Sequence, residues 1–241
     1  MLYGQYPYEK YPAIKYKEYS NWKTYDRVEK EHKLHYTLTI PGFYSNSDSI
    51  TVQFTISDSL GYSTIRIYKN KKQIHRFKEF DAFYGLTEPL SIFVADYNND
   101  GLMDIKFLVP SHGCGAYNYY TRVIYLLQNA DNNFKKVSYT DLFIDFENRL
   151  ERDFDGDGNY EVITQTFKNY KQHNYWLFNL YNFADDNLVN VNYKDNYPIM
   201  IQLLYRDNFE VTNKISRDKM KDFSMILPDD YKDQYNTGGN K

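Results

Sequence analysis

The chain has 241 residues, 42% hydrophobic and 25% charged, with a formal net charge of −3 at pH 7. This length suits one large β-domain or two small ones. The nearly balanced charge argues against nucleic acid or an anionic membrane surface as partner, and no apolar run approaches the roughly 18 residues of a membrane-spanning helix. Aromatic residues reach 19%, mostly Tyr and Phe, which favours strands over helices.

The N-terminal residues 1–36 are polar and rich in tyrosine, and no period of 2 or 3.6 runs through them. We expect an extended arm that docks on a β-body, with a short helix at 26–32. Residues 1–10 lack the apolar core of a signal peptide, so any leader is absent from this chain. The single cysteine, Cys114, excludes an internal disulfide and does not decide the redox compartment.

Residues 37–228 are predicted to form the folded domain. Residues 49–56 alternate apolar and polar side chains, so one face of that strand is expected to be buried. Two further strands, 63–68 and 73–77, flank a hairpin turn at 69–72. An apolar strand at 89–95 leads to an acidic loop.

Two acidic stretches, 96–104 and 153–161, share the pattern D-x-[DN]-x-D-G-x-x-[DE]. Oxygen ligands at alternate positions let a tight loop curl around one hard cation, and the glycine at the sixth position permits the sharp turn. Calcium fits such an oxygen-only set better than zinc or copper. The predicted Ca²⁺ ligands are Asp96, Asn98, Asp100, the carbonyl of Leu102 and Asp104 in the first loop, and Asp153, Asp155, Asp157, the carbonyl of Asn159 and Glu161 in the second.

Neither loop belongs to a helix-loop-helix calcium hand, which needs Glu at the twelfth position. That position holds Phe107 in the first loop and Thr164 in the second. Residues 105–109 and 162–167, which follow the loops, are rich in β-branched and aromatic residues and are predicted strands. The alternative is that both stretches are plain acidic turns, since Asp, Asn and Gly are common turn residues.

A D-x-D-G-D-G-like loop that leads directly into a strand resembles the FG-GAP and VCBS repeats of β-propellers. The resemblance covers each loop and little else, and the FG and GAP signatures are not evident. It implies antiparallel blades with calcium in the blade connections, and a role in adhesion or binding rather than a catalytic activity.

An internal repeat supports this resemblance. The second loop begins 57 residues after the first (153 − 96), and 183–188 matches 129–134 at an offset of 54 (183 − 129). Each repeat reads as calcium loop, strand, long loop, strand, turn and strand, which is a propeller-blade period. We therefore expect an all-β, propeller-like or curved antiparallel fold with three to four repeats.

The C-terminal region is predicted to be less regular. Ser216 is a candidate cap for a short helix that begins at Arg217. Residues 229–241 are polar and contain two adjacent glycines, so a flexible tail is expected.

The loop 111–120 is the other unusual stretch, since His112 and Cys114 lie among glycines and tyrosines. A Cys–His pair two residues apart lacks an orienting third group, so no catalytic residue is assigned. The loop partly resembles the protruding loop of periplasmic lysozyme inhibitors, although its spacing departs from that pattern. On this resemblance the predicted partner-binding residues are Ser111, Gly113, Gly115 and Tyr117.

These observations predict a calcium-stabilised, non-enzymatic binding protein of the periplasm, cell surface or exterior, which recognises a protein or a glycan. Calcium sites without the twelfth ligand are typical of extracellular modules, which are filled only outside the cytosol. Two alternatives stay open: an inhibitor of a cell-wall hydrolase, and a hydrolase whose site the sequence does not reveal.

Overall fold

The computed structural model describes residues 10–28, 33–45, 48–57, 62–80, 91–112, 119–142, 149–204 and 209–234. Three antiparallel sheets carry the fold, and none closes on itself. The first contains β2 (Lys23–Val28), β3 (Lys33–Ser45), β4 (Asp48–Ser57), β5 (Tyr62–Lys69) and β6 (Lys72–Phe80). The second orders β1 (Lys17–Tyr19), β7 (Ile92–Ala95), β8 (Asp104–His112), β9 (Tyr119–Gln128), β10 (Phe134–Asp141) and β15 (Lys232–Gln234). The third contains β11 (Glu161–Tyr170), β12 (His173–Ala184), β13 (Asn187–Asn190) and β14 (Ile199–Gln202).

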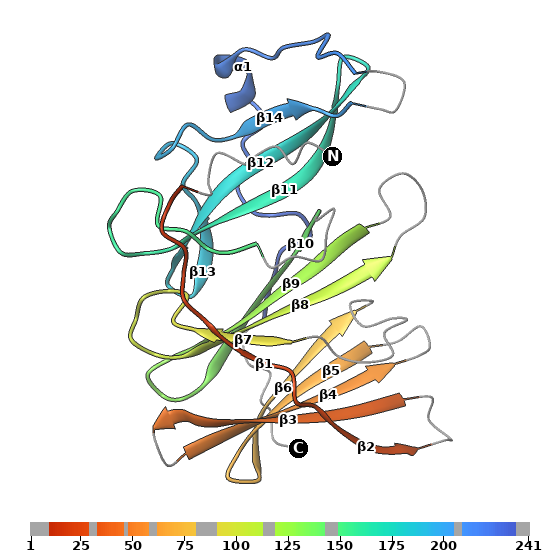
Figure 1. The fold of residues 1–241 in the computed structure, drawn as a ribbon, viewed down its shortest axis with the longest axis vertical. Helices are drawn as coiled ribbons and strands as arrows, with labels where there is room; N and C mark the ends of the chain where they lie inside the picture. The colour runs from red at the N-terminus through yellow and green to blue at the C-terminus, as the bar shows by residue number, and fades with distance from the viewer. Residues whose placement is uncertain are drawn as a thin grey trace.

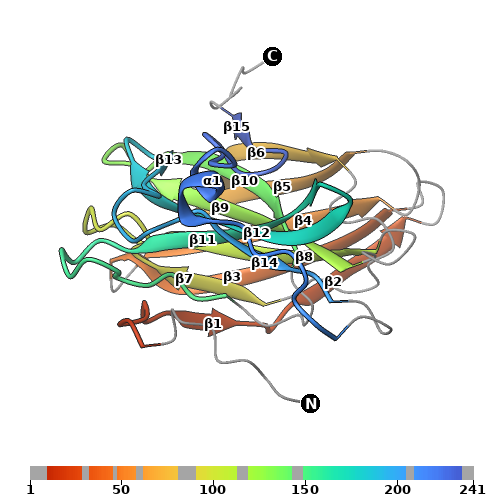
Figure 2. The same cartoon turned by 90° about the horizontal axis from the view of Figure 1, so that it is seen from above.

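The three sheets are stacked along the long axis of the molecule (Figure 1), and lie over one another when seen from above (Figure 2). One apolar cluster joins the first sheet to the second, with Phe54 against Phe107 at a ring-centroid distance of 5.1 Å. Another joins the second sheet to the third, with Tyr125 against Phe183 at 5.1 Å. The all-β prediction is confirmed, and the observed architecture is an open stack of three sheets.

Position in the stack explains two different sequence patterns. The second sheet is buried on both faces, because Ile124 and Leu126 face the first sheet while Tyr125 and Leu127 face the third. Its strands β7 and β9 therefore contain nearly continuous apolar runs. The first sheet is an outer layer, so β4 alternates buried Ile50 and Val52 with more polar residues, as the sequence predicts.

Buried ion pairs accompany the apolar contacts between the sheets. Between the first and second sheets, the Glu79 carboxylate accepts hydrogen bonds from Lys136 and Arg122, the latter at 3.3 Å from Nε. Each charge has an opposite partner, which offsets the cost of removing it from water.

The predicted hairpin at 69–72 is confirmed. β5 ends at Lys69 and β6 begins at Lys72, and Asn70 and Lys71 between them have φ of 49° and 66°. Positive φ at both central residues is the mark of a type I′ turn, whose twist matches that of the flanking strands.

The predicted repeat corresponds to two similar meanders, β8-β9-β10 and β11-β12-β13. Each begins where an acidic loop ends, at Asp104 and at Glu161. The prediction of a long loop after the first strand is wrong for the second copy, because β11 and β12 are joined directly through Lys171 and Gln172. Both residues have positive φ, so two residues suffice to reverse the chain.

Both ends of the described chain pair with distant strands. β1 lies antiparallel to β7, and β15 lies antiparallel to β10, so the supposed arm and tail supply the two edges of the second sheet. The helix expected at 26–32 is wrong for residues 26–28, which belong to β2, and its remainder lies outside the described residues.

The predicted C-terminal helix is present as α1 (Arg217–Lys221), and the Ser216 side chain accepts a hydrogen bond from the Lys219 amide as its N-cap. It lies at the outer end of the stack, beside the third sheet (Figure 1). Among the described residues, α1 is too short to cross a membrane, and no other helix has the length and apolar character for it.

Candidate metal centre

The two acidic loops lie side by side at one edge of the stack, at the left in Figure 1. The Asn99 side chain donates a hydrogen bond to Asn159 at 3.3 Å, which joins the tips of the two loops. Asn98 donates to Asp186, in the β12–β13 turn, at 3.1 Å. The repeat therefore brings together two loops that are 57 residues apart in the sequence.

Each loop is anchored by an aromatic residue at its second position. Tyr97 and Phe154 are buried in the cores on either side of the third sheet. The preceding aspartate in each loop accepts backbone amides across the turn. Asp153, for example, accepts from Gly156 at 2.7 Å and from Gly158 at 3.2 Å.

Glycines at the sharpest points permit the curl of the second loop. Gly156 and Gly158 have φ of +76° and +87°, a region that other residues rarely adopt. The amides of both glycines donate to Asp153, so the positive φ values close the loop around that carboxylate.

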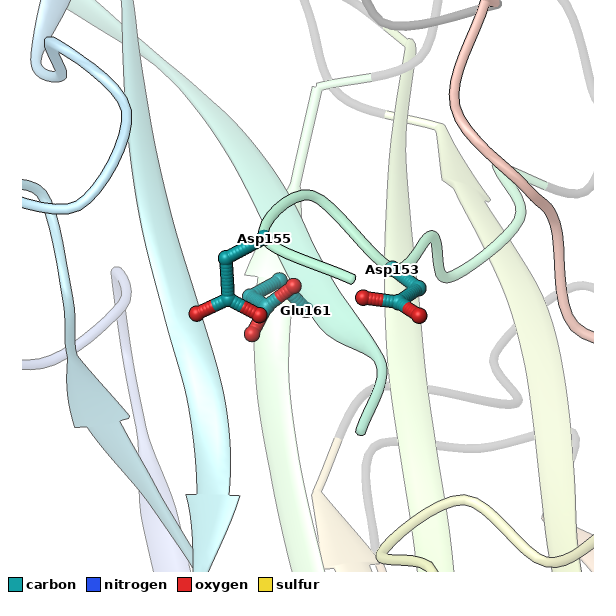
Figure 3. A group of neighbouring side chains, drawn as sticks. All are labelled: Asp153, Asp155 and Glu161. Atoms are coloured by element: carbon teal, nitrogen blue, oxygen red, sulfur yellow. The ribbon is translucent and has the colours of Figure 1, made fainter. Parts of the chain in front are cut away.

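Asp153, Asp155 and Glu161 form the candidate metal centre. One carboxylate oxygen from each lies within 4.8 Å of the others. Figure 3 shows Asp153 and Asp155 on the loop and Glu161 at the start of β11, with their carboxylates turned toward one another. Among the described residues, this is the group of acidic, histidine or cysteine side chains that gathers closely enough to share one ion.

Glu161 supplies the observation that distinguishes this group from an ordinary acidic turn. Its side chain is fully buried, and Oε2 accepts a hydrogen bond from the Phe154 amide at 2.9 Å. Oε1 is also buried and has no hydrogen-bond partner. A buried carboxylate oxygen without a donor is costly, and a bound cation would satisfy it.

The charges in this group shift its protonation equilibria. Burial raises the pKa of Glu161 to about 7, and the neighbouring charges of Asp155 and Asp157 act in the same direction. The pKa of Asp157 is lowered, mainly because its carboxylate accepts the Asn159 amide.

Lys194 is the residue of this site that the sequence analysis missed. Its Nζ lies 2.7 Å from Asp155, 3.6 Å from Asp157 and 3.9 Å from Glu161. The hydrogen bond to Asp155 raises the pKa of Lys194. Lys194 lies 33 residues beyond Glu161 (194 − 161), in a segment with no motif, so no local signal indicates its role.

In the first loop, Asp96 and Asp100 accept backbone amides much as Asp153 and Asp157 do in the second, and the two loops differ at the ninth residue. Asp96 accepts the amides of Asp100 at 3.1 Å and Gly101 at 2.8 Å, and Asp100 accepts the Leu102 amide at 2.7 Å. Asp104 is completely buried, and its two oxygens accept the amides of Tyr97 at 2.9 Å and Gln128 at 2.7 Å.

Burial, more than any other factor, raises the pKa of Asp104, while its two amide donors act in the opposite direction. Its carboxylate is committed to backbone amides, and the acidic side chains of this loop do not gather as those of the second loop do. The two predicted sites therefore differ in geometry, and the ligands predicted in the first loop stay predictions. The carbonyls of Leu102 and Asn159 stay predicted ligands.

The donor set of the second loop fits calcium. It offers three carboxylates, with Asp157 beside them, and no nitrogen or sulfur ligand. Hard cations with several oxygen ligands bind in such loops, whereas zinc and copper favour imidazole and thiolate. When bound, calcium would neutralise the crowded carboxylates, and Asp153, Asp155 and Glu161 would hold it.

A second group of charged side chains lies between the second and third sheets. Lys106 Nζ is 2.6 Å from Glu151 Oε1, and Arg149 is 3.2 Å from Asp141. They line a cavity of about 10 Å³. That volume suits one water molecule, and the two ion pairs join the second sheet to the third.

The predicted partner-binding loop falls mostly outside the described residues. Gly113, Gly115 and Tyr117, together with Cys114, lie in the undescribed range 113–118. The backbone of Ser111 belongs to β8 and pairs with Tyr120 of β9. The proposed role of this loop stays a prediction.

Comparisons with family models, with curated proteins and with solved structures found no match to this chain.

Proposed function

We propose that this chain is a calcium-stabilised binding protein that works outside the cytoplasm and recognises a protein or a glycan. The observation that carries the proposal is the second loop, where Glu161 gathers with Asp153 and Asp155, and where its buried Oε1 has no hydrogen-bond partner. The three stacked meanders support a propeller-like repeat, with each sheet in the place of one blade.

The chemistry of the second loop supports a location outside the cytoplasm. Its twelfth position is Thr164, so the site lacks the bidentate glutamate of the high-affinity calcium hands. Sites of the extracellular class have dissociation constants of about 10⁻⁴ to 10⁻³ M, and are filled at extracellular calcium concentrations only.

Exposed apolar side chains support a binding role. Tyr193 and Phe209 are each 80% exposed and Ile226 is 84% exposed, all within or after the third sheet. Aromatic and aliphatic side chains of this kind are enriched where partners meet, and we propose that these three contact the partner. The first sheet presents mainly polar residues on its outer side, for example Thr39, which pairs with Thr51.

The proposal is tested by calorimetry with calcium on the wild-type chain and on a Glu161→Gln variant. We expect a millimolar or submillimolar dissociation constant for the wild type, and at least tenfold weaker binding after loss of the ligand charge. Asp131→Asn, in the exposed β9–β10 turn, is the matched control and should bind like the wild type. Equal binding by all three proteins, or none by the wild type, would overturn the calcium site.

The binding role is tested by a pull-down from a cell-envelope extract with calcium or with chelator. We expect calcium-dependent capture by the wild type and its loss in a Tyr193→Ser/Phe209→Ser variant. The control variant Tyr16→Ser, just before β1, should keep it. Capture that is the same with chelator, and with the double variant, would contradict the proposed role.

A further inference from the structure

Lys194 places an ammonium group among the carboxylates that would bind the metal. Its Nζ makes a 2.7 Å hydrogen bond to Asp155, and lies within 3.9 Å of the unpaired Glu161 oxygen. An ammonium and a divalent cation are attracted by the same oxygen atoms, and their like charges exclude both from being there together.

The backbone under Lys194 is fixed to the third sheet. Val191 donates to the Leu180 carbonyl at 2.9 Å, and the buried Asn192 side chain bonds the Leu180 amide and Asn179. Tyr197 donates to the Asn192 carbonyl at 2.9 Å, which closes the segment. This hydrogen-bonded turn therefore holds the backbone of Lys194 beside the acidic loop.

The same segment is packed against the acidic loop. Val191 and Tyr197, on either side of Lys194, share a buried cluster with Phe154, the second residue of the loop. The Phe154 and Tyr197 rings meet edge to face at 6.1 Å. The side chain of Lys194 itself is 21% exposed, so its flexible stem has a route into solvent while the backbone stays in place.

We infer that Lys194 is an internal competitor that sets the calcium affinity of the second loop. In the absence of calcium, its single positive charge offsets part of the repulsion among Asp155, Asp157 and Glu161. Calcium expels the ammonium into solvent and takes its place. This inference rests on the calcium site proposed above.

The test compares calcium binding by the wild type, Lys194→Met and Lys168→Met. Methionine keeps an apolar stem and removes the charge. Lys168 is the matched control, because it is exposed on the strand that begins with Glu161, seven residues further on (168 − 161), or about 23 Å. Its loss changes the net charge equally without touching the loop.

We expect Lys194→Met to bind calcium about tenfold more tightly than the wild type, since one charge-assisted hydrogen bond no longer competes. Lys168→Met should stay within about twofold of the wild type. The melting temperature gives a second readout. Without calcium, Lys194→Met should melt below the wild type, because its carboxylates repel one another, and its rise with calcium should be larger.

The outcomes separate the two proposals. Calcium binding by the wild type with an unchanged dissociation constant in Lys194→Met overturns the competitor and leaves the site intact. Absence of binding by all three proteins overturns the site itself. If Lys194→Met does not fold without calcium, Lys194→Gln, with a polar head, provides the same comparison, and an unchanged affinity there has the same meaning.

Discussion

The two acidic loops share a sequence pattern, each leads into a strand, and both lie at one edge of the stack. Their ninth residues, however, make different hydrogen bonds. Asp104 uses both oxygens to accept buried backbone amides, whereas Glu161 uses one oxygen and leaves the other unpaired. Glutamate is one methylene longer, which lets its carboxylate reach past the backbone toward Asp155. The same motif, repeated in one chain, can therefore form a structural turn in one copy and a candidate ion-binding loop in the other.

The largest effect is expected from Asp104→Ala. It would leave the amides of Tyr97 and Gln128 buried without acceptors, at about 1–3 kcal/mol each, or about 2–6 kcal/mol in all. Urea unfolding in chelator and in calcium should show the same loss. Asp104→Asn retains one acceptor oxygen, so a smaller loss is expected. A loss that calcium restores would mean that Asp104 is a metal ligand after all.

The next effect concerns pH in the metal-free protein. The pKa of Glu161 is raised from 4.5 to about 7 by burial, so the folded state holds a proton that the unfolded state has lost. Stability should therefore fall as pH rises from about 4.5 to 7, by about 3 kcal/mol at most. Denaturant unfolding in chelator at several pH values measures it. Glu161→Gln should flatten this part of the profile, and an unchanged profile would assign it to other groups.

Calcium should raise the melting temperature through the second loop. At a hundredfold excess over the dissociation constant, a ligand of the folded state adds about 2.7 kcal/mol, or roughly 5–10 °C for a chain of this size. Asp155→Asn should remove much of the rise, because it takes one negative charge from the three carboxylates of the site. Asp100→Asn, in the first loop, is the control. The opposite ranking of these variants would reverse the assignment of the site.

The smallest effect tests the contact between the loops. Asn99→Ala removes the exposed hydrogen bond to Asn159, which is expected to contribute about 0.5–1 kcal/mol. Calcium affinity should change by less than about threefold, because neither residue supplies a carboxylate. A larger change, measured by calorimetry, would show that the first loop positions the second.

The sequence by itself determined the features that depend on neighbouring residues. Alternation in 49–56 predicted a half-buried strand, Asn70 and Lys71 were placed in a turn, and both acidic loops were predicted to end at a strand. Ser216 was recognised as a helix cap. Each of these follows from a local period or a local backbone preference, which acts over a few residues.

Only the tertiary structure decided how the segments meet. Residues 17–19 and 232–234 supply the edges of the second sheet, although nothing in their composition specifies a partner. Lys194 reaches the second loop because β13 returns beside it. The hydrogen bonding of Asp104 differs from that of Glu161 because of the backbone amides that surround each carboxylate. These contacts depend on how the chain turns over many residues, which no short stretch of sequence specifies. The side chains involved are polar types that occur on the surface of any protein. Their roles become visible only when burial, distance and the number of available hydrogen-bond donors are known.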